Sequence, residues 1–192
     1  SSGKAARSAR TSLTLILESL VKMVAPVLSF TSEEIWGVYR TELKGRAKES
    51  VHLEDFPSIP DGFFAGVDAA AIEKKWDRLL ASKEPVKKAL ESLRNKKIIG
   101  DGLEAKVTVG SSNAETVSFL KENLKNLPML YIVSQVDIDS PGEIADPTLT
   151  EGEFTVKAVK ADGAKCVRCW NWSAKVGADA SHPELCDRCV EA

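Results

Sequence analysis

Four cysteines near the end of this chain constrain it more than any other feature. They form two Cys-x-x-Cys pairs, Cys166 with Cys169 and Cys186 with Cys189, and sixteen residues separate the pairs. Each pair can turn two sulfurs toward one ion, and Zn²⁺ prefers four such ligands at the corners of a tetrahedron. The chain has no other cysteine. We therefore expect one structural Zn²⁺ site, closed by four thiolates and without an open position for catalysis.

Two disulfides or a redox-active pair are the alternative interpretations of these cysteines. Neither pair lies in the strand-then-helix setting of a thioredoxin-like motif, and no secretory signal peptide is recognisable. His182 lies between the pairs and could replace one thiolate, although four sulfurs already complete the tetrahedron. Spacing and ligand count favour Zn²⁺ bound by the four cysteines.

The formal net charge of −2 conceals an uneven distribution of charged residues. Residues 1–50 hold 8 basic and 5 acidic side chains, residues 73–100 hold 9 and 4, and residues 101–165 hold 6 and 11. The basic segments are compatible with a polyanionic partner. No apolar run approaches the length of a membrane span, so we expect a cytoplasmic protein with no membrane partner. The sequence lacks an initiator Met, and we expect it to be a piece of a larger protein.

Hydrophobic spacing predicts two helices in the N-terminal third. The first covers residues 5–25, ends before Pro26, and buries a stripe formed by Leu13, Leu17, Leu20 and Val24. Residues 31–34 read Thr-Ser-Glu-Glu, a capping box that would start the second helix, and Phe30 would pack on Ile35 as a hydrophobic staple. The buried face of this second helix is predicted from its spacing to hold Ile35, Trp36, Tyr39 and Leu43.

A short extended piece at residues 50–53 and a long helix at 68–97 follow. Pro85 should kink or split the long helix, because proline lacks a backbone donor and its ring collides with the preceding turn. Gly100 and Gly102 should close it. The residues expected on its buried face are Ile72, Trp76, Leu79, Val86, Leu90 and Leu93.

The hydrophobic period changes after residue 103. Alternation predicts strands at 105–109, 130–134 and 154–159, with a helix at 113–127 and an acidic loop at 141–152. The fold class is therefore α+β and multidomain. We predict a helical bundle over residues 1–102, a small α/β junction unit over 103–162, and a four-cysteine zinc finger over 163–192.

Signatures of catalysis are missing from the sequence. It contains no P-loop, GxGxxG, GxSxG or HExxH pattern. Its two histidines, His52 and His182, have no partner at catalytic spacing. These observations favour a binding module over a catalyst.

Several segments, in order, resemble the C-terminal region of bacterial isoleucyl-tRNA synthetases. They are residues 23–36, 50–53, 94–105, 165–170 and 185–190. The first segment is equally similar to the valyl and leucyl relatives, and the terminal Cys-x-x-Cys-Trp finger points to the isoleucyl enzymes. The finger also resembles that of base-excision DNA glycosylases, but the preceding helices do not fit such a protein.

The resemblance implies a helical domain of the class I anticodon-binding type. It implies that the chain holds the anticodon stem-loop of isoleucine tRNA while upstream domains carry out ATP-dependent aminoacylation. The HIGH-type and KMSKS-type signatures are absent, so we expect a fragment that is inactive alone. The expected partners are isoleucine tRNA and the rest of the synthetase chain, and we expect a monomer.

Two groups of residues are candidates for RNA contact. Phosphates of a stem would be met by basic helical residues, namely Arg7, Arg10, Lys74, Lys75, Arg78, Lys87 and Lys88. Unstacked anticodon bases would meet the finger through Trp170, Arg168, Lys175 and Arg188. We expect the two arginines to project outward, and one of Trp170 and Trp172 to be packed while the other is exposed.

Two alternatives remain open from the sequence. The C-terminal part could be a structural clamp that docks on the synthetase body with little RNA affinity of its own, and the acidic stretch 137–153 favours it because it would repel RNA. The chain could also be a free-standing DNA-binding finger protein, although its basic surface is sparse for duplex binding.

Overall fold

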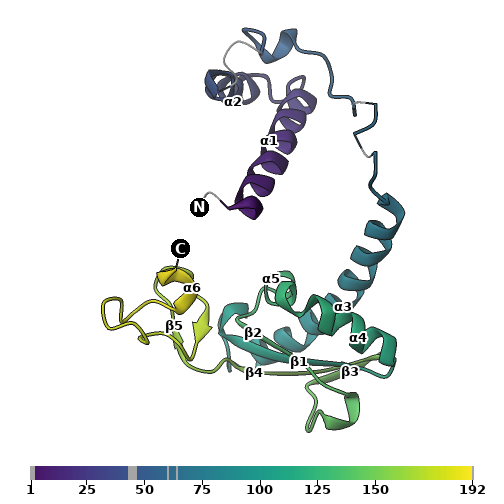
Figure 1. Ribbon diagram of the computed structural model, residues 1–192, viewed down its shortest axis with the longest axis vertical. Coiled ribbons are helices and arrows are strands. Elements are labelled where there is room, and N and C mark those ends of the chain that lie inside the picture. The colour runs from purple at the N-terminus through teal and green to yellow at the C-terminus, as the bar shows by residue number, and fades with distance from the viewer. Residues whose placement is uncertain (1–2, 43–46, 60, 64, 192) are drawn as a thin grey trace. The chain divides into compact units, whose positions relative to one another are not determined.

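The computed structural model describes residues 3–42, 47–59, 61–63 and 65–191, shown as ribbons in Figure 1. The chain divides into two compact units, Ser1–Val67 and Asp68–Ala192. The division lies at the start of the long helix, so this helix packs with the sheet that follows it. The predicted domain limits at residues 102 and 162 stay predictions. Among the described residues, no helix is both long and apolar enough to cross a membrane.

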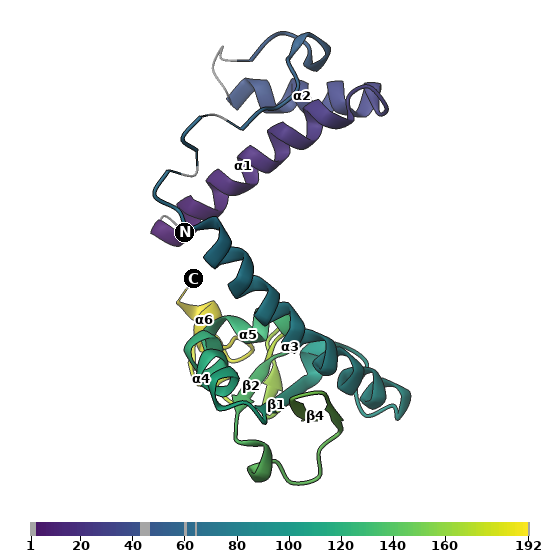
Figure 2. The same cartoon turned by 90° about the vertical axis from the view of Figure 1, so that its right-hand side faces the viewer.

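The first unit is a helical hairpin with a small core. Helices α1 (Lys4–Val24) and α2 (Ser29–Glu42) contact each other, as Figure 2 shows, and the 3-10 helix η1 (Val51–Leu53) packs on both. Trp36 is buried, as predicted, and its Nε1 donates to the Lys48 carbonyl oxygen at 3.0 Å. The other buried apolar residues that the structure describes in this unit are Val21, Ala25 and Val51.

The predicted buried stripe of α1 is wrong. Leu13, Leu17 and Leu20 are exposed, and the buried positions are instead Val21 and Ala25. Periodicity identified the helix correctly, but it could not show that the described residues of this unit leave most of the stripe exposed. The three leucines of the predicted stripe are therefore exposed to solvent in this unit.

The predicted start of α2 is also wrong. The helix begins at Ser29, so Thr31 lies inside it rather than capping it. The N–H groups of Val27 and Leu28 both donate to the Val24 carbonyl, so the backbone turns directly from one helix into the next. Phe30 is 93% exposed, which excludes the hydrophobic staple. Residue 43, expected on the buried face, lies outside the described residues.

The loop at residues 50–53 forms a 3-10 turn instead of the predicted extended piece. The Ser50 hydroxyl accepts a hydrogen bond from the His52 N–H and donates to the Glu33 carboxylate at 2.8 Å. The same carboxylate accepts the Val51 N–H at 3.1 Å. Side-chain hydrogen bonds of this kind compete with extended structure.

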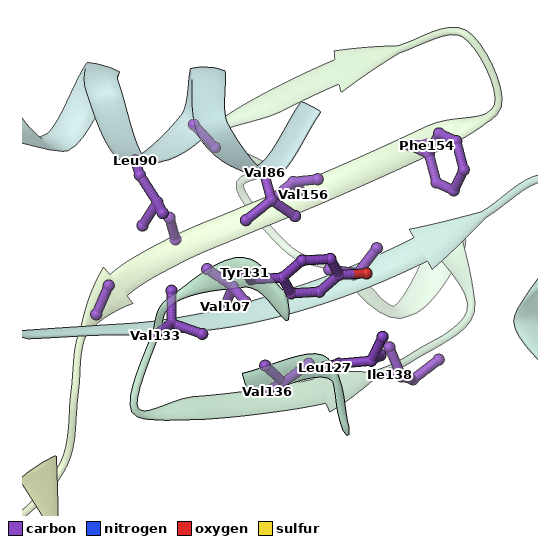
Figure 3. Packing of buried hydrophobic residues seen from close by; sticks show 14 of the residues in the cluster. Val86, Leu90, Val107, Leu127, Tyr131, Val133, Val136, Ile138, Phe154 and Val156 are labelled. Carbon is purple, nitrogen blue, oxygen red and sulfur yellow. The ribbon is translucent and has the colours of Figure 1, made fainter. Parts of the chain in front are cut away.

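The second unit is a four-stranded sheet with helices on one face. The strand order is β2-β1-β4-β3, with β1 parallel to β2 and antiparallel to β4, and β3 antiparallel to β4. Val107, Val109 and Val156 point into the core, which Figure 3 shows between the sheet and the helices. The strands are β1 (Ala105–Ser111), β2 (Gln135–Ile138), β3 (Leu149–Glu151) and β4 (Phe154–Lys160).

The other face of the sheet is polar. Lys106 Nζ lies 3.0 Å from a carboxylate oxygen of Asp137 and 3.5 Å from one of Asp162. Alternation along β1 places Lys106 opposite to Val107, so one face is covered and the other is solvated. The predicted strands at 105–109 and 154–159 are confirmed within β1 and β4.

Helix α3 (Ala69–Asn95) stays continuous through Pro85, so the predicted split did not occur. The hydrogen bond that proline cannot donate would have reached Ala81, an exposed residue whose carbonyl water can serve. From Leu79 onward α3 packs on the sheet, through Leu79, Val86, Leu90 and Leu93, as predicted. Ile72 and Trp76 were predicted to be buried but are about half exposed, because the first turns of α3 extend beyond the sheet.

The end of α3 differs from the prediction as well. Lys97 adopts the left-handed conformation with φ 57°, and the Ile98 N–H donates to the Leu93 carbonyl at 3.0 Å. This Schellman arrangement closes the helix before either predicted glycine. Gly102 has a different role, because a Cβ there would lie 2.6 Å from the backbone oxygen of Ile132.

The segment 113–134 is helical for longer than predicted. It forms α4 (Ala114–Asn123), the 3-10 helix η3 (Leu124–Asn126) and α5 (Leu127–Tyr131). The predicted strand at 130–134 is wrong, because Ile132 takes a left-handed conformation that ends α5, and β2 begins three residues later. The predicted acidic loop contains the 3-10 helix η4 (Pro141–Glu143) and strand β3.

Gly102→Ala should destabilise the second unit, because the added methyl group would collide with the Ile132 carbonyl. We expect a loss of about 1–3 kcal/mol in the free energy of unfolding, the usual cost of overpacking. Urea denaturation followed by circular dichroism measures it. Gly142→Ala is the matched control, since a Cβ there has nothing within 4 Å. Equal stability of the two variants would contradict the assignment.

Candidate metal centre and nucleic-acid interface

Two short strands and one helical turn bring the four cysteines together. Strands β5 (Ala164–Lys165) and β6 (Trp172–Ser173) pair antiparallel, so the first Cys-x-x-Cys pair lies in the hairpin between them. Cys186 precedes helix α6 (Asp187–Val190), which carries Cys189. All four sulfurs lie within 4.8 Å of one another.

The spacing of the sulfurs fits one Zn²⁺ ion. Cys169 Sγ and Cys186 Sγ are 3.7 Å apart, and a tetrahedron with Zn–S bonds of about 2.3 Å has edges of about 3.8 Å. All four cysteines are free thiols rather than disulfides. His182 is exposed, and its Nδ1 lies 3.7 Å from an Asp179 carboxylate oxygen. It is not a member of the group of four cysteines that could hold a metal ion among the described residues.

Hydrogen bonds from the backbone shape the first knuckle. The Trp170 N–H donates to the Cys166 carbonyl at 2.8 Å, and the Cys166 N–H donates to the Asn171 carbonyl at 2.9 Å. Trp170 takes the left-handed conformation with φ 64°. This turn reverses the chain within four residues and leaves both sulfurs on the same side.

The electrostatic environment of Cys166 favours the thiolate that a metal requires. Burial of the thiol opposes ionisation, but N–H groups of Cys169, Cys186 and Arg168 donate to its sulfur and bring its pKa down to about 6. The Cys186 N–H lies 3.4 Å from that sulfur. Burial and the neighbouring sulfurs raise the pKa of Cys189 to about 12. A divalent cation offsets this mutual repulsion when it is bound.

The finger is fastened to the sheet unit by polar contacts. The Trp172 N–H donates to the Ser134 hydroxyl at 2.7 Å, and Ser134 in turn donates to the Leu103 carbonyl. Gln135 Nε2 donates to the carbonyls of Asp162 at 2.9 Å and Trp172 at 3.4 Å. The turn before β2 therefore holds the finger at β6.

The two tryptophans of the finger differ in exposure, as expected. Trp170 is 61% exposed, and the Lys165 ammonium lies 5.2 Å from its ring centroid. Trp172 is half-buried, and the Lys160 ammonium lies 5.1 Å from its ring centroid. The sequence could not assign these roles, because both residues follow the same knuckle.

The predicted cations of the finger all make contacts within it. Arg168 Nη1 donates to the Cys189 carbonyl at 2.8 Å, and the Arg188 guanidinium bonds to the Cys169 sulfur, which raises the pKa of that guanidinium. Both arginines are exposed, in keeping with the expected outward projection, but each also makes a contact within the finger. Lys175 pairs with Asp187 at 2.8 Å. Contact of these residues with RNA stays a prediction.

The predicted cations of the helices are distributed over both units. Arg7 and Arg10 are exposed residues of α1, whereas Lys74 and Lys75 are exposed on the first turns of α3. Arg78 lies 3.5 Å from a Glu115 carboxylate oxygen and 4.2 Å from the Phe119 ring centroid. On α3, Lys87 pairs with Glu84 and Lys88 with Glu151. RNA contact by any of these residues also stays a prediction.

One feature of the surface has no signal in the sequence. A groove of about 470 Å³ lies between the finger and the α5–β2 turn, and we call it the finger groove. Its walls include Leu103, Pro128, Met129, Ile132, Trp172 and Arg188. These residues come from four separate segments of the chain, so no local sequence pattern indicates them.

Comparison with known proteins gives two matches to family models. Residues 1–109 match the family described as the anticodon-binding domain of tRNA ligase, and residues 163–192 match a zinc finger found in FPG and IleRS. The second match agrees with the geometry of the cysteines, and the finger carries one structural Zn²⁺.

Curated relatives match almost the whole chain. It is 42% identical over 188 residues to an isoleucine–tRNA ligase of Syntrophotalea carbinolica, which covers 97% of the chain and 19% of that protein. It is 42% identical over 187 residues to that of Brachyspira hyodysenteriae and 40% identical over 186 residues to that of Staphylococcus carnosus, and each match covers 19% of the relative and at least 95% of the chain. The chain thus spans about a fifth of the length of these relatives.

Cys186→Ser should weaken zinc binding at least about tenfold, because it removes one of four thiolate ligands. Native mass spectrometry should find one Zn²⁺ per wild-type chain. His182→Ala is the matched control and should leave the stoichiometry and affinity unchanged. Loss of zinc from the His182 variant, or retention by the Cys186 variant, would contradict the four-sulfur assignment.

Proposed function

The chain belongs to the family of anticodon-binding domains of tRNA ligases, and from this premise we propose that it is the tRNA-binding part of an isoleucine–tRNA ligase. It holds the anticodon stem-loop of isoleucine tRNA. The ATP-dependent aminoacylation belongs to the remaining four-fifths of such a ligase. The observation that carries the proposal is the joint match of residues 1–109 and 163–192, in this order, to an anticodon-binding domain and to a finger found in IleRS.

The proposed layout has three parts. A helical anticodon-binding part covers residues 1–102, a junction unit 103–162, and the finger 163–192. The α3 helix links the first two parts in sequence, and its second half packs on the junction sheet. The finger is fixed to the same sheet through Ser134 and Gln135. This arrangement supports a function in which the sheet carries the finger as a rigid attachment.

Trp170 is the best-placed residue for contact with an anticodon base. Anticodon bases are unstacked, so an exposed aromatic ring can stack on them. The left-handed backbone of Trp170 and its N–H bond to Cys166 hold the indole out from the knuckle. Lys165 beside the ring adds a positive charge for the flanking phosphate. The role of Zn²⁺ in this proposal is to fix the shape of the finger.

Contacts with the stem fall to the basic helices. Arg7, Arg10 and Lys74 are exposed residues of α1 and α3, and cations of this kind position RNA by its phosphates without reading its sequence. Arg78, Lys87 and Lys88 already pair with carboxylates, so they would exchange those partners for phosphates. Contacts of these cations with stem phosphates would therefore contribute less to specificity than contacts with the unpaired bases of the loop.

One observation favours docking on the rest of a synthetase chain as a second candidate, but it places the docking surface in the first unit and not in the C-terminal part, where the structural clamp was predicted. A groove of about 400 Å³ in the first unit is lined mainly by apolar residues of α1 and the loop after η1. They are Leu15, Ile16, Leu20, Met23, Ile59 and Phe63. Such a surface suits docking against the rest of a synthetase chain.

Trp170→Ala should weaken binding of isoleucine tRNA by about 1–3 kcal/mol, the usual contribution of one stacked base. Trp170→Phe keeps a ring and should retain most of the affinity. Fluorescence anisotropy across a salt series measures both, with a tRNA of swapped anticodon beside the cognate one.

The comparison of the two tRNAs decides between the candidates. Tighter binding of the cognate tRNA supports anticodon reading. Equal and strongly salt-dependent binding of both would limit the chain to phosphate contact. No binding at moderate salt would contradict the proposal and favour the structural clamp.

A further inference from the structure

The four cysteines of the metal centre differ in their exposure. Cys166, Cys186 and Cys189 are buried, with 0%, 4% and 7% of their surfaces exposed, whereas Cys169 is half-buried. Cys169 and Cys186 both line the finger groove, which has a volume of about 470 Å³. A small polar molecule that enters this groove therefore meets one cysteine of each Cys-x-x-Cys pair.

The same two cysteines are placed to form a disulfide with each other. Their sulfurs are 3.7 Å apart, and a disulfide brings two sulfurs to about 2.05 Å. The Cys166 sulfur instead lies 3.4 Å from the Cys186 N–H, which donates to it. Such a hydrogen bond stabilises a thiolate and makes it a weaker nucleophile. We therefore expect a disulfide to join the two Cys-x-x-Cys pairs rather than to form within one of them.

The surroundings of Cys169 favour oxidation of its sulfur. A thiol that coordinates Zn²⁺ is deprotonated, and the thiolate is the form that reacts with oxidants. The Arg188 guanidinium bonds to the Cys169 sulfur, so a positive charge also lies beside it. Redox-sensing cysteines are accessible thiolates that have a second cysteine close by. Cys169, with Cys186 beside it, meets both conditions.

We propose that the zinc site is a peroxide-sensitive switch, in which Cys169 is oxidised first and then forms a disulfide with Cys186. The disulfide removes two of the four ligands, so the ion is released. The finger then loses its shape, because metal binding and folding are coupled in modules of this kind. The oxidation step rests on the geometry of the metal centre alone. Its consequence for RNA rests on the proposed function, in which the finger presents Trp170.

The oxidant of the switch is hydrogen peroxide, and the reaction has two steps. The Cys169 thiolate attacks one peroxide oxygen, so an S–O bond forms, the O–O bond breaks and hydroxide leaves. The Cys186 thiolate then attacks the sulfur of the resulting sulfenic acid, so the S–S bond forms and a second hydroxide leaves. The two sulfurs lose two electrons to the peroxide, and both hydroxides take up protons from the solvent. Cys166 and Cys189 stay reduced, and a dithiol reverses the oxidation.

Peroxide treatment of the zinc-loaded chain tests the switch without RNA. Zinc release is followed with a chromophoric chelator in the presence and absence of peroxide, thiols are counted by alkylation, and disulfides are mapped by mass spectrometry. We expect release of one Zn²⁺ and loss of two thiols per chain, with Cys169 joined to Cys186. Dimedone added together with the peroxide should trap the sulfenic acid at Cys169. Dithiothreitol with added zinc should restore the metal-bound chain.

A pair of histidine variants tests which cysteine reacts first. Cys169→His keeps a zinc ligand, because sites of three cysteines and one histidine also bind zinc, but it removes the sulfur that peroxide should attack. It should release zinc at least about fivefold more slowly than the wild-type chain at the same peroxide concentration. Cys189→His is the matched control, since it keeps Cys169 and Cys186 and should still form the disulfide. Native mass spectrometry first checks that each variant holds Zn²⁺, and where one does not, trapping and mapping in the wild-type chain decide.

The outcomes separate the switch from the proposed function. Disulfides within the Cys-x-x-Cys pairs, trapping of sulfenic acid at another cysteine, or retention of zinc at peroxide concentrations that oxidise free cysteine would overturn the switch. None of these measurements involves RNA, so each would leave the tRNA-binding proposal standing.

The consequence for RNA has its own measurement. Peroxide should abolish the preference of the chain for isoleucine tRNA over the same tRNA with a swapped anticodon, and dithiothreitol with zinc should restore it. A preference that survives zinc release would overturn the effect of the switch on RNA binding. A reduced, zinc-loaded chain that shows no preference would overturn the proposed function and leave the oxidation chemistry standing.

Discussion

The interaction on which the finger depends is the convergence of four sulfurs on one point. Cys166, Cys186 and Cys189 are its buried apolar residues, and Cys169, Val176 and Leu185 pack against them. So small a cluster cannot stabilise about thirty residues by hydrophobic burial alone. Four thiolates within 4.8 Å of one another would also repel without a cation. Zinc removes the repulsion and supplies the missing core.

The sheet unit carries this metal-held module. Ser134 and Gln135, at the start of β2, form hydrogen bonds with the backbone of β6. These bonds fix the finger relative to the central strands. The turn that presents these two residues depends on Ile132 in a left-handed conformation and on Gly102 beside it. The finger groove lies at this junction. Zinc, turn and sheet therefore determine together where Trp170 and Trp172 lie.

The sequence predicted the features that follow from local chemistry. Ligand spacing identified the metal site, helical spacing identified the buried Trp36, and alternation identified β1 and β4. The errors arose where tertiary context decides. The apolar run 130–134 fits a strand or a helix end equally well. In the structure it is a helix end, because Ile132 adopts the left-handed conformation that terminates α5. The stripe on α1 predicted burial, but Leu13, Leu17 and Leu20 are exposed among the described residues of the first unit. The finger groove had no local signal at all.

In the proposed function zinc organises the surface that binds RNA, and the anticodon preference of the chain with and without metal measures this role. Affinities for isoleucine tRNA and for the same tRNA with a swapped anticodon would be measured before and after removal of zinc by a chelator, and again after zinc is restored. We expect chelation to abolish the preference while leaving weak, salt-dependent binding through the helices, and added zinc to restore the preference. An unchanged preference in the metal-free chain would contradict the account.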